Sequence, residues 1–227
     1  MPRTARITPG GMVFHVLNRG VGRMRLFHKD RDYEAFEEIL AKTLLSCPMR
    51  ICAYCLMPNH WHFVLWPEKN GDLAAFMQKL TITHVRNWQE HRRRVGRGHV
   101  YQGRYKSFPL ETDDSYYQVT RYVERNALRA NLVESADAWR WSSLWRREHG
   151  TTADRRLLSG WPLPRSRRWC EFVNAPQTAA EVKAIRRAVN QGQPYGSASW
   201  VRKTAKKLGL ESTLRRRGRP RKSDPNS

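Results

Sequence analysis

The 227-residue sequence predicts an α+β protein, with a ferredoxin-like antiparallel sheet and helices on one face, a helical C-terminal extension and a basic tail. Apolar residues make up 40% of the chain, which is enough for a folded core. Strand and helix patterns follow one another in the order strand, helix, hairpin, helix, strand, helix. After about Val133 the pattern becomes irregular, then helical, then strongly basic.

Short local signals place each element. A β-rich run follows Gly10-Gly11, Pro48 stops the first helix, and the turn pair Pro58-Asn59 joins two apolar strands into a hairpin. The expected elements are a strand over 12–18, a helix from Asp30 to Cys47, strands over 50–57 and 60–66, a helix from Asp72 into 91–94, a strand over 101–110, and a helix capped by Thr112 or Asp113 that runs to Asn131.

The same pattern divides the chain into four parts. They are a sheet domain over 1–132, an irregular connection packed on it over 133–175, a helical extension over 176–210, and a basic, flexible tail over 211–227. Within the extension we expect helices over 178–191 and 199–208.

The charge balance points to a polyanion as partner. Lys and Arg number 42 against 20 Asp and Glu, a net charge of +22, so nucleic acid is the first candidate and an anionic membrane surface the second. No apolar run approaches the ~18–20 residues of a membrane span, and no signal peptide is evident. We therefore expect a soluble intracellular protein.

The cysteines do not form a convincing metal site. Cys52 and Cys55 have C-x-x-C spacing, but no second pair follows at zinc-site spacing. Residues three apart on a strand point to opposite faces, which argues against a shared metal. We interpret the cysteines as free thiols in a reducing compartment.

The segment from His60 to Leu65 suggests a different metal site. On a strand, His60 and His62 project from the same face about 7 Å apart, while Trp61 and Phe63 point into the core. Two imidazoles so placed can share a divalent cation. The alternative is a strand with two surface histidines that are merely hydrogen-bonded.

The third expected helix carries Tyr122 and Asn126, four residues apart and so on one helix face. A phenol and an amide facing a metal held by two histidines form a set that can cleave a phosphodiester. The metal offsets the phosphate charge, the phenolate forms a covalent phosphotyrosine, and the freed 3′-hydroxyl can reverse the reaction. The alternative is that Tyr122 is a core aromatic in an apolar stripe with Val119 and Val123.

Several motifs together resemble one protein family. The matching pieces, in chain order, are Leu17-Asn18-Arg19-Gly20, Met57-Pro58-Asn59-His60-Trp61-His62, Gln102-Gly103-Arg104-Tyr105, Tyr122-Val123-Glu124-Arg125-Asn126, Trp139-Arg140-Trp141-Ser142-Ser143 and Pro194-Tyr195-Gly196. They resemble the REP-associated tyrosine transposases, relatives of the single-tyrosine transposases of insertion sequences within the endonucleases that carry a His-hydrophobic-His (HUH) motif.

The resemblance implies a catalytic domain over 1–132 with a metal bound by His60 and His62, Asn126 as third ligand and Tyr122 as nucleophile. Relatives often have Gln where this chain has Asn126. The implied metal is Mg²⁺ or Mn²⁺. The implied reaction is cleavage and rejoining of single-stranded DNA hairpins of repetitive extragenic palindromes (REPs) through a 5′-phosphotyrosine, in the prokaryotic cytoplasm and associated with the nucleoid. Monomer and homodimer both remain open.

Two basic segments are candidates for DNA contact. The first combines cations with Tyr101 and Tyr105, whose rings could stack on bases, and places Arg104 and Lys106 on one strand face. The second resembles an AT-hook, although a nonspecific basic tail fits as well. The candidate residues are Arg92, Arg93, Arg94, Arg97, Arg104 and Lys106, then Arg217, Arg219, Arg221 and Lys222.

Three other functions remain open from sequence. A noncatalytic DNA-hairpin-binding regulator would share the charge and the fold. An RNA-binding protein would use the sheet to stack unpaired bases. A replication initiator or relaxase would often carry a second active tyrosine, but Tyr116 and Tyr117 lie five and six residues before Tyr122 and should point away from its face.

Overall fold

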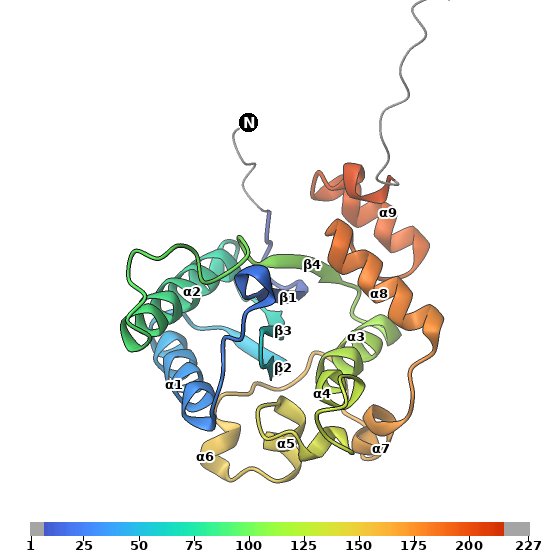
Figure 1. Cartoon of the computed structure of the whole chain (residues 1–227). Helices are drawn as coiled ribbons and strands as arrows, with labels where there is room; N and C mark the ends of the chain where they lie inside the picture. The colour runs from blue at the N-terminus through green and yellow to red at the C-terminus, as the bar shows by residue number, and fades with distance from the viewer. Residues whose placement is uncertain (1–6, 216–227) are drawn as a thin grey trace, which may run out of the picture.

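The computed structural model describes residues 7–215, and its centre is a four-stranded antiparallel sheet in the order β2-β3-β1-β4 (Figure 1). The strands are β1 (Val13–Arg19), β2 (Arg50–Met57), β3 (His60–Trp66) and β4 (Lys106–Leu110). In the register of β1 and β3, Leu17 lies opposite His62 and Arg19 opposite His60. The hairpin boundaries match the sequence prediction.

Two helices cover the first face of the sheet. They are α1 (Asp30–Ser46) and α2 (Asp72–His91), which lie side by side (Figure 1). Phe36 of α1 and Phe76 of α2 share one buried core with Trp61 and Phe63 of β3. The strands and these two helices form the expected ferredoxin-like arrangement, and the predicted α+β class is confirmed.

Helices also cover the second face, which corrects the expectation of helices on one face. They are α3 (Asp114–Glu124), α4 (Asn126–Arg129) and α8 (Ala179–Gln191). A second core joins Val64 and Phe108 of the sheet to Val119 of α3 and Ile185 of α8. The strands are apolar on both sides, as sheets covered on both faces are, so alternation could not show which face was exposed.

Three local features differ from the sequence prediction. The strand expected from Tyr101 begins only at Lys106, and Tyr101 forms an isolated bridge with Gly20. The third helix is interrupted at Arg125, whose ψ of 2° departs from helical geometry. A bulge in β2 between Ile51 and Ala53 brings both Cys52 and Cys55 into the second-face core, where they are free thiols.

The segment over 133–175 contains short helices where an irregular connection was expected. They are η2 (Ala136–Ala138), α5 (Ser143–Glu148), α6 (Thr152–Arg155) and α7 (Trp169–Asn174). The segment follows the edge strand β2: the Leu56 amide donates to the Trp141 carbonyl (2.9 Å), and the Trp139 indole donates to the Leu56 carbonyl (2.8 Å).

The remaining elements are short. They are η1 (Val21–Arg23), α9 (Ala198–Lys207) and η3 (Glu211–Leu214). Both helices of the expected extension form, and Thr178 caps α8. Among residues 7–215, no helix has the length and hydrophobicity that crossing a membrane requires.

Candidate active site

Strand β3 places two imidazoles side by side on the second face of the sheet. His62 is buried, His60 is half-buried, and their ring centroids are 5.0 Å apart. Trp61, between them, points into the first-face core. The strand periodicity expected from sequence thus brings His60 and His62 together, with their rings toward α3.

Each of these histidines uses its Nδ1 atom in a hydrogen bond. His62 Nδ1 lies 2.9 Å from Nε2 of His15, a fully buried residue of β1, and His60 Nδ1 lies 2.6 Å from Oδ1 of Asn59. Because Asn59 Oδ1 can only accept, His60 carries its proton on Nδ1. Neither Nε2 atom has a partner within residues 7–215, which leaves two imidazole nitrogens available as ligands.

Burial keeps both imidazoles neutral. It lowers the pKa of His60 to about 4 and that of His62 well below 6.5, and the nearby charges of Arg19 and Arg129 lower both further. Neutral imidazole is the form that binds metals. Within residues 7–215, no carboxylate is among the causes of either shift, and neither Arg19 nor Arg129 forms an ion pair.

Helix α3 brings Tyr122 to the histidine pair. The Tyr122 ring lies edge-on, with its centroid 6.0 Å from that of His62 and 6.4 Å from that of His15. Its hydroxyl has no hydrogen-bond partner among the described residues. It is also not among their side-chain polar atoms that are buried from solvent without a partner. Tyr117 turns away and donates its hydroxyl to the Pro164 carbonyl (2.7 Å), as expected for a residue off this face.

Arg129 joins Tyr122 to Asn126, and the sequence analysis missed it. Its guanidinium carbon lies 4.0 Å from the Tyr122 ring centroid, and Nη2 donates to the Tyr122 carbonyl (3.2 Å) and to Oδ1 of Asn126 (3.0 Å). Arg129 follows Tyr122 by seven residues and Asn126 by three, and that helical spacing was the available signal.

Comparison with known proteins identifies the family to which this chain belongs. The profile described as "Transposase IS200 like" matches residues 10–126, just over half of the chain. The protein belongs to the IS200-like transposase family. The match begins before β1 and ends at Asn126, so it contains both histidines and Tyr122. No curated protein matches the chain.

The solved structures that match this IS200-like transposase include one that covers most of the chain. It is described as a REP-associated tyrosine transposase bound to a REP hairpin, and it superposes with a TM-score of 0.53 at 17% sequence identity. The superposition covers 79% of this chain and 100% of that one, so the likeness extends past the region of the family match.

The donor set of this transposase fits a divalent metal, but not a closed structural site. No group of three His, Cys, Asp or Glu side chains in residues 7–215 could hold an ion. Asn126 is buried, and its amide oxygen, which accepts from Arg129, keeps a second lone pair. Its Nδ2 atom is buried without a partner. Together with the Asn126 amide oxygen, the two imidazoles would form an open set that leaves positions for substrate.

The predicted DNA-contacting residues are only partly where the sequence placed them. Arg93, Arg94 and Arg97 are exposed in the loop after α2, whereas Arg92 is half-buried and pairs with Asp32 at 2.6 Å. The Asp32 pKa lies below its usual value, and its partners His28, Arg92 and Lys29 stabilise the charged form against burial.

Arg104 and Lys106 are both exposed, but Arg104 precedes β4, so the prediction that they share a strand face is wrong. The prediction that the Tyr101 ring is free to stack on bases is also wrong. The ring is buried, and its hydroxyl accepts from the Trp61 indole (2.9 Å) and lies 2.6 Å from His84 Nδ1. Arg217, Arg219, Arg221 and Lys222 lie outside the described residues.

Proposed function

We propose that this transposase cleaves and rejoins single-stranded DNA at the hairpins of repetitive extragenic palindromes, with Tyr122 as the nucleophile. The observation that carries the proposal is the Tyr122 ring beside a histidine pair whose two Nε2 atoms are unengaged. The family match supports a DNA-processing enzyme, and the REP hairpin bound in the structural neighbour supports the choice of substrate.

In the proposed reaction, Tyr122 Oη attacks the scissile phosphorus while the bond from phosphorus to the 3′ oxygen breaks. The products are a 5′-phosphotyrosine and a free 3′-hydroxyl, whose oxygen takes up a proton. The Tyr122 proton passes to solvent, since no described side chain accepts a hydrogen bond from its hydroxyl. Attack by a 3′-hydroxyl on the phosphotyrosine reverses these bond changes and rejoins the strand.

His60 and His62 would hold the metal through their Nε2 atoms, with the Asn126 amide oxygen as a third ligand. A bound Mg²⁺ or Mn²⁺ supplies positive charge that offsets the charge developing on the phosphate. Arg129 orients Tyr122 and Asn126 together: its guanidinium lies over the phenol ring and donates to the Asn126 amide oxygen.

The test is a cleavage assay on a labelled single-stranded REP hairpin with Mn²⁺, Mg²⁺ or EDTA. We expect metal-dependent cutting with a covalent protein–DNA adduct, both lost in Tyr122→Phe and retained in the matched control Tyr117→Phe. Tight hairpin binding without cutting under either metal would overturn the nuclease proposal in favour of a noncatalytic hairpin-binding regulator. A competition with the matched RNA hairpin tests the choice of DNA.

A further inference from the structure

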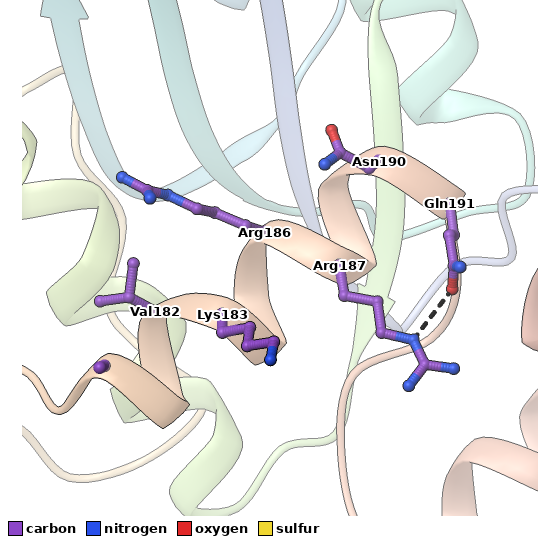
Figure 2. A pocket seen from close by; sticks show the side chains of 7 residues that line it. Val182, Lys183, Arg186, Arg187, Asn190 and Gln191 are labelled. Carbon is purple, nitrogen blue, oxygen red and sulfur yellow. Dashed lines mark hydrogen bonds between the residues drawn. The ribbon is translucent and has the colours of Figure 1, made fainter. Parts of the chain in front are cut away.

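Helix α8 presents a basic face that borders the active site. Ile185 and Ala188 are buried in the second-face core, whereas Lys183, Arg186 and Arg187 are exposed on the outer side. These cations line an open hollow of about 630 Å³ whose apolar part is formed by Ala179 and Val182 (Figure 2). We call Lys183, Arg186 and Arg187, with the hollow they line, the α8 face.

The cations of the α8 face have no acidic partner among residues 7–215. Arg187 Nε donates to Gln191 Oε1 (3.2 Å), as Figure 2 shows, and no ion pair involves Lys183 or Arg186. The acid of this helix, Glu181, is engaged by Thr178 in the capping box.

Arginines on the first-face helices, by contrast, have acidic partners. Arg31 on α1 pairs with Glu34 and Glu38, and Arg86 on α2 pairs with Glu90. The α8 sequence supplies no carboxylate at such a spacing, so its positive charge is open to an external anion.

This charge is continuous with the candidate active site. Helix α8 packs against α3, and Ile185 and Ala188 lie in the same buried core as Tyr122. Beyond α8 the chain returns to the sheet, where the Tyr195 amide donates to the Pro109 carbonyl of β4 (2.9 Å). Helix α8 itself also contacts β4, the strand that begins with the exposed Lys106.

We propose that the α8 face binds the phosphate backbone of single-stranded DNA next to the scissile phosphate. The inference rests on the proposed function, because that function places a phosphodiester at Tyr122. The face offers cations at helical spacing and no aromatic side chain, so it contacts phosphates and does not stack bases. Its contribution is independent of base sequence and sensitive to salt.

The experiment measures binding of two REP hairpins, one with and one without a single-stranded flank, in EDTA on the Tyr122→Phe background. The test variant adds Lys183→Gln, Arg186→Gln and Arg187→Gln. Its matched control adds Lys42→Gln, Lys69→Gln and Lys79→Gln, which remove the same charge from exposed sites on or next to the first-face helices.

We expect the test variant to reduce the slope of log affinity against log salt by about 2 for the flanked hairpin, about 0.7 for each of three phosphates. Between 50 and 200 mM salt the parent should then lose about 20-fold more affinity than the variant. For the hairpin without a flank, the test variant should lose no affinity relative to the parent. For a hairpin with a flank of scrambled sequence, it should lose as much affinity as for the REP flank. The control variant should behave as the parent.

An unchanged salt slope in the test variant overturns the proposal, as does an equal loss with the flankless hairpin. Either result leaves the proposed function intact if the wild-type protein still forms its Tyr122 adduct. Absence of any affinity gain from the flank in the parent also overturns the proposal. Failure of the proposed function is seen separately, as absence of the adduct in wild type.

Discussion

Replacing His15 with leucine should weaken divalent-metal binding by about 10- to 100-fold, the effect typical of removing a group that orients a ligand. His15 is fully buried, its Nε2 lies 2.9 Å from Nδ1 of His62, and the two rings stack with centroids 5.0 Å apart. For His62 to offer the lone pair of Nε2, its proton must sit on Nδ1 and be donated to His15. In the tautomer of His62 that can bind a metal, His15 Nε2 is therefore the acceptor for the buried Nδ1–H.

The size of the expected loss of metal affinity follows from the polar group that the substitution leaves unpaired. Without the acceptor, the buried His62 Nδ1–H is unpaired at a cost of about 1–3 kcal/mol, which favours the other tautomer. A 10- to 100-fold loss of affinity corresponds to about 1.4–2.7 kcal/mol, within that range. The stability of the protein should change less, because His15 Nδ1 is itself buried without a partner and leucine removes it.

The assay is a Mn²⁺ titration of the Tyr122→Phe protein bound to a hairpin, with free Mn²⁺ read by electron paramagnetic resonance. His15→Gln is the matched control, because its amide oxygen can accept the His62 proton and should restore most of the affinity. Thermal denaturation of each variant reports folding independently of metal.

Leu and Gln variants with equal affinity would show that the hydrogen bond to His62 does not matter. Affinity unchanged in His15→Leu but lost in His60→Ala would place the metal at the histidine pair and refute the tautomer argument. A fall in both metal affinity and melting temperature that Gln does not repair would assign His15 a packing role instead.

Three further predictions concern pH, Arg129 and the coupling of metal to DNA. Burial lowers the pKa of His84 to about 3. As pH falls below about 6.5, the unfolded chain therefore binds a proton at His84 that the folded protein does not bind, and the free energy of unfolding declines. In urea denaturation between pH 6 and 4, His84→Phe should reduce that decline by about 1.4 kcal/mol per pH unit, and an unchanged slope would contradict the burial argument. Arg129→Met should slow adduct formation in single-turnover assays by about 2- to 30-fold, which corresponds to about 0.5–2 kcal/mol of cation–π contact, with partial recovery in Arg129→Lys. Because Arg19 and Arg129 face the histidine pair without a carboxylate, hairpin DNA should raise Mn²⁺ affinity at least about 10-fold by calorimetry, and Mn²⁺ should raise DNA affinity by the same factor; equal Mn²⁺ affinities with and without DNA would refute this.

Local signals were enough for most of the fold. The hairpin of β2 and β3 was predicted with its observed bounds because both strands are apolar runs separated by a Pro-Asn turn. Helix α8 was predicted within a residue, and in the structure Thr178 and Glu181 form a capping box at its start. The placement of α3 on the second face was missed, because an apolar helix stripe does not specify which side of a two-sided sheet it covers.

The candidate site, like the fold, was predicted from the sequence only in part. The pairing of His60 with His62 follows from the two-residue period of a strand, and the position of Tyr122 from its spacing to Asn126. His15 and Arg129 were not predicted. The role of His15 depends on the β1–β3 register. The spacing of Arg129 to Tyr122 and Asn126 indicates a shared helix face, but it does not specify the contacts that Arg129 makes there.

The helix that carries Tyr122 is held in place by residues beyond the family match. Glu124 is fully buried, and its carboxylate accepts from Ser143 Oγ (2.6 Å) and from the Trp169 indole (2.6 Å). Next to it, Arg125 donates to the Val173 carbonyl (3.1 Å). Burial raises the pKa of Glu124, and the hydrogen bonds from Ser143 and Trp169 oppose part of that effect. Without the segment over 133–175, a buried carboxylate two residues from Tyr122 would lose both partners, each worth about 1.5–3 kcal/mol. That segment is therefore part of what orients the nucleophile, although the family match ends at Asn126.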